Sequence, residues 1–159
     1  MARQLKLLGC VMLSNFLLWT TPSYAASKAL VVCIKDYNYW SRLQNSRNDA
    51  EDMAQALKNL GFDTTLIIRD EQGEVNHQRF KQAIENFAQT LQANDSVVFF
   101  YSGHGAAIPT DNNSTEGYLI ASNTPAVKRG NKQAIEQNAI ALKTIAETLS
   151  DKIDPDTGS

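Results

Sequence analysis

Three apolar runs typical of β-strands alternate with two segments of helical periodicity, and this order constrains the fold more than any other feature of the 159-residue sequence. The runs cover residues 29–34, 62–68 and 96–101 and are rich in β-branched and aromatic side chains. The run over residues 29–34 is apolar throughout, rather than alternating, which is typical of a strand buried on both faces of a parallel sheet. Residues 62–68 are rich in Thr and Ile, and residues 96–101 are the most hydrophobic of the three. The sequence therefore predicts a buried parallel sheet within its first hundred residues.

The two intervening segments have the spacing of amphipathic helices. Residues 47–60 form the first, which Gly61 is predicted to end, and the second stops before Asn94 and Asp95. The apolar positions are Ala50, Met53, Ala54, Leu57 and Leu60 in the first, and Phe80, Ile84, Phe87, Ala88 and Leu91 in the second. Strands joined by helices in this order form right-handed crossovers. We therefore expect an α/β fold, a three-layer α-β-α sandwich with a mainly parallel sheet.

Residues 1–25 differ from the rest of the chain in composition. Arg3 and Lys6 precede an uncharged apolar run over 7–19, and Ser23-Tyr24-Ala25 has the small-x-small pattern of a cleavage site. This pattern predicts a signal peptide (1–25), a mature domain (26–159), and a secreted or periplasmic location. An uncleaved membrane anchor and lipid attachment at Cys10 remain open as alternatives.

Charge and cysteine content exclude several classes of protein. The chain has 15 Lys and Arg against 17 Asp and Glu, a formal net charge of -2, and no basic block, which argues against nucleic-acid binding. Two cysteines are too few for a disulfide framework, and cleavage after Ala25 would leave only Cys33. No spacing of His, Cys and carboxylates indicates a zinc site, so no metal is predicted.

The second half of the sequence is less regular. Residues 103–131 are rich in Asn, Thr, Ser, Gly and Pro, which predicts a loop interrupted by the short apolar piece 118–121. Residues 139–149 have helical spacing, and the last ten residues are mostly polar. We expect one further helix and no further strand of the main sheet.

Ser102-Gly103-His104-Gly105 follows the third predicted strand directly. Parallel sheets bind ligands beyond the carboxyl ends of their strands, where the strand order reverses. A histidine between two glycines at that place is suited to act as a general base. The alternative is a turn histidine without a role in chemistry. His77, at the polar start of the second helix, is predicted to be solvated.

Four blocks of the sequence, 29–34, 43–50, 60–62 and 98–105, resemble the caspase-like cysteine peptidases, nearer to the bacterial and metacaspase branch than to animal caspases. The resemblance covers most of the predicted mature chain. It implies a caspase-like fold, cysteine-type endopeptidase activity on peptide or protein substrates, and a Cys/His dyad. Because some metacaspases need calcium, it also makes calcium a cation to test, although the sequence has no EF-hand-like loop.

The resemblance also assigns roles by position. His104 matches the dyad histidine, and Gly105 matches the glycine whose backbone N–H helps to form the oxyanion hole. Asp49 and Ser102 match the metacaspase pocket for a basic residue before the scissile bond. Animal caspases bind aspartate with an arginine near the position that Leu43 has in this sequence. The leucine therefore argues against aspartate specificity.

Other interpretations of these pocket residues stay open. Ser46-x-x-Asp49 approximates a helix capping box, and an acidic side chain is favoured in any first helical turn. Ser102 is also a common type of turn residue. Arg42 and Arg47 are close enough in sequence to leave aspartate specificity open.

The family's nucleophile has no counterpart in this sequence. Its cysteine follows a fourth strand, after the helix that here ends near residue 149, and Cys33 lies within the first predicted strand, where we expect it to be buried. We therefore expect the chain to be inactive alone, with strand 96–101 forming an open sheet edge. A truncated gene, a complementing chain and a pseudo-peptidase are three explanations. A non-catalytic module that recruits a partner through this edge is the alternative function.

Overall fold

The computed structural model describes residues 25–68, 75–110, 114–126 and 132–154. Apart from Ala25, the predicted signal peptide lies outside the described residues. Ten helices and strands make up the described part of the chain. Their bounds are β1 Ser27–Cys33, α1 Ser46–Asn59, β2 Asp63–Ile68, α2 His77–Gln89, β3 Ser96–Ser102, β4 Gly105–Pro109, β5 Thr115–Ile120, α3 Lys132–Asn138, β6 Ala139–Ala141 and α4 Leu142–Ile153.

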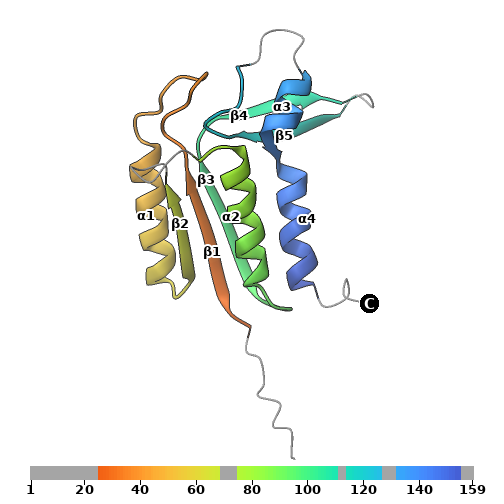
Figure 1. The fold of residues 1–159 in the computed structure, drawn as a ribbon. Coiled ribbons are helices and arrows are strands. Elements are labelled where there is room, and N and C mark those ends of the chain that lie inside the picture. The colour runs from red at the N-terminus through yellow and green to blue at the C-terminus, as the bar shows by residue number, and fades with distance from the viewer. Residues whose placement is uncertain (1–24, 69–74, 111–113, 127–131, 155–159) are drawn as a thin grey trace, which may run out of the picture.

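The main sheet is parallel and has the strand order β2-β1-β3 (Figure 1). The central strand β1 carries Leu30, Val31 and Val32, which are all fully buried. Alternate side chains point to opposite faces of a strand, so a strand covered on both sides must be apolar at every position. This arrangement confirms the three predicted strands and their parallel pairing.

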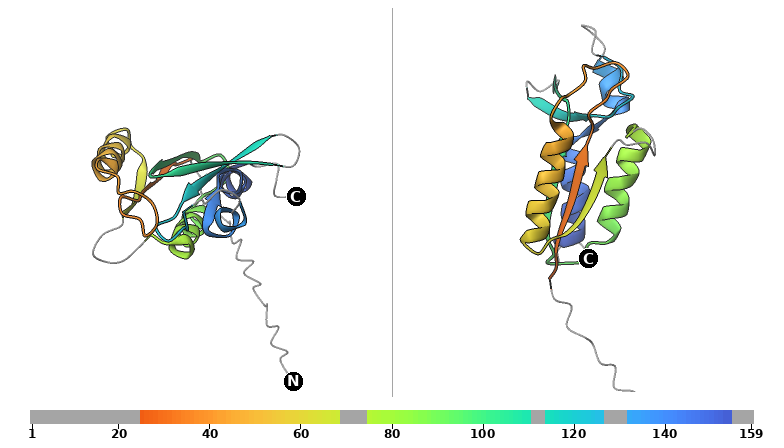
Figure 2. Two further views of the ribbon diagram at one scale, coloured as in Figure 1. Left: turned by 90° about the horizontal axis from the view of Figure 1, so that it is seen from above. Right: turned by 90° about the vertical axis from the view of Figure 1, so that its left-hand side faces the viewer.

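Helices cover both faces of the main sheet (Figure 2). On one face, α1 packs Ala50, Ala54 and Leu57 against alternate residues of β1 and β3. On the other face, α2 and α4 pack together over the remaining side chains of the sheet. The α1 helix ends as predicted, because Gly61 takes a φ of +86°, which favours glycine. The predicted three-layer α-β-α sandwich is confirmed.

A second, antiparallel sheet differs from the sequence prediction. Residues 103–131 were expected to form a loop, but β4 and β5 pair as a hairpin and β6 extends them in the order β4-β5-β6. The β4 segment, Gly-Ala-Ala-Ile-Pro, has little β-propensity of its own, and it forms a strand through backbone pairing with β5. Since residues 139–141 belong to β6, the last helix, α4, begins at Leu142 instead of Ala139.

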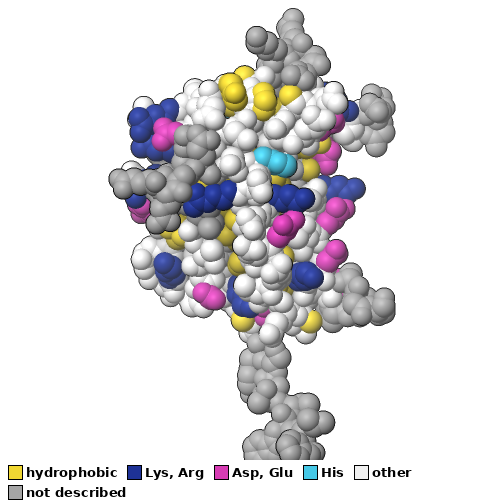
Figure 3. Space-filling model, in the orientation of Figure 1, with side chains coloured by type: hydrophobic (Ala, Val, Ile, Leu, Met, Phe, Trp, Pro, Cys, Tyr) yellow, Lys and Arg dark blue, Asp and Glu magenta, His cyan; other side chains and the backbone are white. Residues whose placement is uncertain are grey.

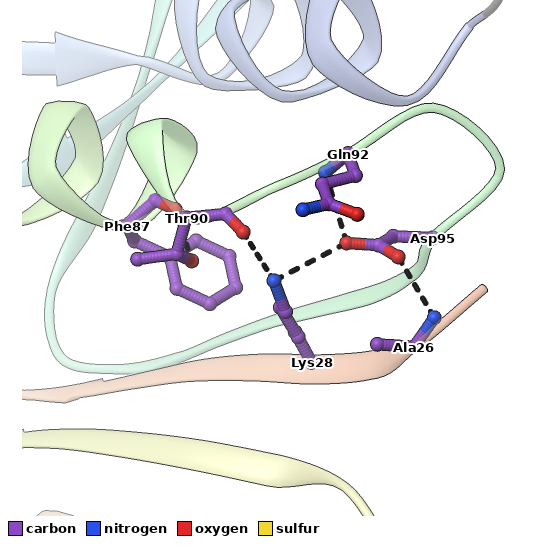
Figure 4. A network of polar contacts seen from close by, with 6 residues as sticks. All are labelled: Ala26, Lys28, Phe87, Thr90, Gln92 and Asp95. Carbon is purple, nitrogen blue, oxygen red and sulfur yellow. Dashed lines mark hydrogen bonds and ion pairs between the residues drawn. The ribbon is translucent and has the colours of Figure 1, made fainter. Parts of the chain in front are cut away.

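A buried carboxylate joins the amino-terminal ends of β1 and β3 (Figure 4). Asp95 is only 5% exposed and accepts hydrogen bonds from the backbone N–H of Ala26 at 2.8 Å and of Gln92 at 2.9 Å. The Lys28 ammonium lies 3.3 Å from its second oxygen and also donates to the Thr90 carbonyl. Burial alone would raise the pKa of Asp95, but these hydrogen bonds and the ammonium outweigh it, so its pKa lies below the usual value.

The strand β3 has one open side. It pairs with β1, and no other described strand pairs with it, so the predicted open edge at residues 96–101 is present in the described part of the chain. The α4 helix packs mainly against α2, β5 and β6. Its last residue, Ile153, accepts a hydrogen bond from the backbone N–H of Asn94, at the amino-terminal end of β3.

The surface carries both signs of charge. In Figure 3, Lys and Arg side chains are interspersed with Asp and Glu side chains on the face seen in Figure 1. Within the ranges that the structure describes, no helix has the length and apolar character needed to span a bilayer.

Candidate active site

His104 lies just beyond the carboxyl end of β3, next to the carboxyl end of β1. The two strand ends are joined by a hydrogen bond from the backbone N–H of Ile34 to the carbonyl of Ser102, at 3.0 Å. Because β1 lies between β2 and β3, this is the point where the strand order reverses. The loop over residues 35–45 follows β1, and its Tyr37 and Ser41 contact His104.

The loop determines which tautomer the neutral His104 ring adopts. Its Nε2 lies 2.7 Å from the backbone carbonyl of Ser41 and 3.4 Å from the Ser41 hydroxyl. A carbonyl oxygen can only accept a hydrogen bond, so Nε2 carries the proton of the neutral ring. Nδ1 then holds the free lone pair, which is the atom that a general base needs.

Two aromatic rings flank the imidazole. The Tyr37 ring centroid lies 4.8 Å from that of His104, and the Trp40 centroid lies 5.5 Å away. The Trp40 indole N–H donates to the Thr124 carbonyl at 3.0 Å, which ties the 35–45 loop to the segment after β5. With these contacts, His104 is half-buried.

Of the two glycines beside His104, only Gly103 is required by close packing. A Cβ at Gly103 would lie 2.2 Å from the Tyr101 Oη, whereas a Cβ at Gly105 would make an ordinary contact of 3.5 Å with the Tyr118 carbonyl. Gly105 is exposed and begins β4 beside the histidine. Its predicted oxyanion role depends on its backbone N–H and not on its lack of a side chain, so this contact does not test that role.

Comparison with known proteins assigns this arrangement to a family. Residues 26–154 match the family described as "Caspase domain". The chain belongs to the caspase-domain family. Its parallel main sheet, covered by helices, agrees with that assignment.

Two curated relatives are fungal metacaspases. Metacaspase-1A of Aspergillus niger is 31% identical over 99 residues, and Metacaspase-1 of Meyerozyma guilliermondii is 33% identical over 99 residues. Each match covers 57% of this chain and 24% of the relative, so the chain spans about a quarter of the length of these proteins. A crystal structure of protein GSU0716 from Geobacter sulfurreducens has the same fold, with a TM-score of 0.58, 18% identity, and coverage of 80% of this chain and 46% of the other.

The two predicted pocket residues lie on different elements of the fold. Asp49 is exposed in the first turn of α1, and Ser102 is the half-buried last residue of β3. Among the described residues, no hydrogen bond joins these two side chains. The predicted capping box is wrong, because the cap of α1 is Asn45 and no side chain makes a cap bond. Asp49 still lies where the positive end of the helix dipole favours a carboxylate.

A buried serine lies at the start of the same helix. Ser46 is 4% exposed, and its hydroxyl oxygen has no hydrogen-bond partner in the described part of the chain. A buried hydroxyl without a full hydrogen bond is costly, and the polar group that it faces is the Cys33 thiol, whose pKa it lowers. From sequence, Ser46 is predicted only as a capping residue.

Cys33 is fully buried at the end of β1, as predicted. It lies opposite Ser102 in the pairing of β1 with β3. Burial raises the pKa of the thiol, against smaller opposing effects of Ser46 and Arg47. A buried neutral thiol cannot act as the family's nucleophile without a large opening of the sheet.

The second histidine lies at a separate cavity. A cavity of about 430 Å³ lies between α2, β5, β6 and α4, and His77 and Glu116 are among its lining residues. His77 is half-buried rather than solvated as predicted, and burial, together with Lys81, lowers its pKa. His104 does not line this cavity. Among the residues with described positions, no three His, Cys, Asp or Glu side chains are grouped as metal ligands are.

Sequence reasoning missed the residues that hold His104. Tyr37, Trp40 and Ser41 lie in a loop of aromatic and polar residues. Nothing in that composition indicates a contact with His104. Tyr101 was assigned only to the apolar third strand. These loop residues lie more than 60 positions before His104 in the sequence. Local sequence patterns do not show which residues so far apart come into contact.

Proposed function

We propose that this chain is the histidine-bearing part of a caspase-like cysteine endopeptidase. One observation carries the proposal, namely the hydrogen bond that links His104 Nε2 to the Ser41 carbonyl at 2.7 Å. It orients the ring and leaves Nδ1 as the proton acceptor. A surface turn histidine has no need of a fixed tautomer.

The chemistry follows from that tautomer. Nδ1 accepts the proton of a cysteine thiol, the thiolate attacks the scissile carbonyl, and the protonated ring then gives its proton to the leaving amine. In the proposed site, the backbone N–H of Gly105 donates to the oxyanion that forms on the carbonyl oxygen. Water hydrolyses the thioester with the same ring acting again as base, which restores the thiol.

The proposed substrate has a basic residue before the scissile bond. The exposed Asp49 carboxylate and the Ser102 hydroxyl are the groups that would bind Arg or Lys. The arginines that could favour aspartate instead are already in ion pairs, Arg42 with Asp36 at 2.9 Å and Arg47 with Glu51 at 2.8 Å. These pairs support basic over acidic substrates.

The nucleophile must come from another polypeptide segment. Cys33 is buried, and Cys10 lies in the predicted signal peptide. We propose that the chain is inactive until a segment pairs with the open edge of β3 and brings a cysteine to His104. A strand parallel to β3 would begin near Asn94, where α4 ends. The segment could belong to the continuation of the same gene or to a complementing chain.

A second candidate is a non-catalytic module that binds a partner strand at the same edge. It is favoured by the open side of β3, with which no strand in the described part of the chain pairs. Genomic sequence after codon 159 separates the two candidates. An Asp-x-Cys block in that sequence supports the enzyme, and its absence favours the module.

We also propose that residues 1–25 export the protein to the periplasm or the exterior. Their basic start, apolar run and small-x-small end support this. Mass spectrometry of the protein recovered from its native host tests it. A mature amino terminus at Ala26 is expected, and an intact chain in the cytoplasm would contradict it.

Peptide binding tests the proposed site without needing the nucleophile. The full-length chain, with isotope-labelled histidine, is titrated with blocked peptides that end in Arg or in Asp, with and without calcium. We expect the Arg peptide to shift the His104 resonances and Asp49→Asn to weaken that effect. Asp52→Asn, an exposed change on the same helix, is the matched control. Preference for the Asp peptide, or equal effects of the two Asn variants, would contradict the proposal.

A further inference from the structure

Two tyrosines lie directly beneath the turn that carries His104. Tyr37 comes from the loop after β1 and Tyr101 from β3, and their hydroxyl oxygens are 3.2 Å apart. The backbone N–H of His104 donates to the Tyr37 hydroxyl at 2.8 Å. The Tyr101 hydroxyl lies 2.8 Å from the Ile120 carbonyl and 3.1 Å from the His104 carbonyl. The phenols therefore reach both backbone groups of the histidine.

The partners determine the direction of these hydrogen bonds. Both carbonyls near Tyr101 can only accept, so the Tyr101 proton points to them and the Tyr101 oxygen is left to accept. Tyr37 already accepts from His104, and its own proton is free to go to Tyr101. The chain runs from His104 N–H to Tyr37, then to Tyr101, and ends on the Ile120 carbonyl.

The phenols keep their protons in this environment. Burial is the main cause that raises the pKa of both Tyr37 and Tyr101. Each hydroxyl therefore stays protonated, and able to donate a hydrogen bond, at neutral pH. The chain needs both protons, because a phenolate could accept but could not pass on a hydrogen bond.

Gly103 is the steric condition for this arrangement. A Cβ on residue 103 would lie 2.2 Å from the Tyr101 oxygen and 2.6 Å from the Tyr37 oxygen. Real Cβ atoms do not approach other atoms so closely, so any other residue would displace the phenols. The Ser-Gly-His order thus leaves room for the pair below the histidine.

We propose that Tyr37 and Tyr101 are positioning residues that fix the backbone of His104 and thereby the direction of its imidazole. Tyr37 acts twice, because its hydroxyl holds the His104 N–H while its ring stands 4.8 Å from the imidazole. Ser41, four residues further along the same loop, accepts from Nε2. A shift of the loop relative to β3 would therefore change the backbone bond and the ring bond together. The role rests on the proposed function of His104, but the arrangement does not.

The test reads His104 itself and needs no catalysis. The chain has only two histidines, so the isotope-labelled full-length protein gives two sets of ring and amide signals, with His77 as internal reference. Tyr37→Phe and Tyr101→Phe each remove one hydroxyl and keep the ring. Tyr39→Phe is the matched control, because Tyr39 is 61% exposed.

We expect Tyr37→Phe, which removes the acceptor of the His104 N–H, to speed amide exchange at His104 by about fivefold to tenfold. Tyr101→Phe removes the partner that holds the Tyr37 hydroxyl, so we expect a smaller increase in the same direction. We also expect the Nε2–H tautomer to become less dominant, while His77 and the Tyr39→Phe protein stay unchanged. A His104 amide that exchanges freely in the unmodified protein would overturn the proposal, even if a variant failed to fold. Unchanged exchange and tautomer in both folded variants would also overturn it.

This test and the peptide-binding test of the proposed function can fail independently. If Arg peptides do not bind but the tyrosine variants alter His104, the proposed protease role fails and the positioning role stands. If Arg peptides bind and the tyrosine variants leave His104 unaltered, the positioning role fails alone.

Discussion

Replacing Asp95 by Asn should destabilise the chain in a way that depends on pH. The carboxylate receives two backbone N–H bonds and one ammonium while 5% exposed. An amide keeps a single acceptor oxygen, so one charge-assisted bond and the ion pair with Lys28 are lost. Because a hydrogen bond to a charged group contributes about 1.5–3 kcal/mol, we expect a loss of about 2 kcal/mol near neutral pH.

The sign of the pH dependence follows from the lowered pKa of Asp95. A carboxyl group whose pKa is lower in the folded state stabilises that state above its unfolded pKa, about 3.9, and stops doing so as pH falls through the folded value. The unfolding free energies of the two proteins should therefore differ fully between about pH 5 and 7, begin to converge near pH 4, and meet only below the folded pKa of Asp95.

Urea denaturation of the full-length chain at several pH values measures this difference. Asp52→Asn, an exposed carboxyl change, should stay within about 0.5 kcal/mol of the unmodified protein. The reasoning is refuted if Asp95→Asn also stays within about 0.5 kcal/mol, or if its effect is the same at low and neutral pH.

Three further changes have distinct expected outcomes. Gly103→Ala should lower the free energy of unfolding in urea by about 2 kcal/mol and speed hydrogen exchange of the His104 amide, because its Cβ would displace the two tyrosines. An unchanged rate of exchange at His104 would contradict this. Cys33→Ala should cost about 1 kcal/mol without affecting Arg-peptide binding, and lost binding would show that the thiol belongs to the site. Asn76→Ala should cost about 1 kcal/mol, since its side chain caps α2 through the Arg79 N–H; an unchanged melting curve would argue against that cap.

The main sheet could be predicted because its signals are local. The run over residues 29–34 is apolar at every position, and only a strand covered on both faces needs that. The α1 helix could be predicted in the same way, from Ala50, Ala54 and Leu57 on one face and Gly61 at its end. In these segments, local preference and tertiary environment agree.

The second sheet could not be predicted, because its strands depend on one another. Residues 105–109 show no alternation and contain a glycine and a proline, and they are extended because β5 supplies their hydrogen bonds. Residues 139–141 continue a helical pattern in sequence, but pairing with β5 makes them a strand. Tertiary contacts override local preference at both places.

The candidate site was predictable only in part. His104 is marked by its place after an apolar strand and between two glycines, which is a local signal. Its partners Ser41 and Tyr37 lie more than 60 residues away, and no local rule connects them. The capping prediction at Ser46 failed because that side chain turns into the protein, where its hydroxyl is buried.

The most direct test of the central claim is hydrolysis of fluorogenic Arg, Lys and Asp peptides by the purified full-length chain, with and without calcium. His104→Ala is the control. If His104 serves a site whose nucleophile comes from another segment, none of the three peptides is cleaved by the chain alone, although it is folded. Turnover that His104→Ala abolishes would contradict the account, because it would mean that this chain already contains the attacking thiol.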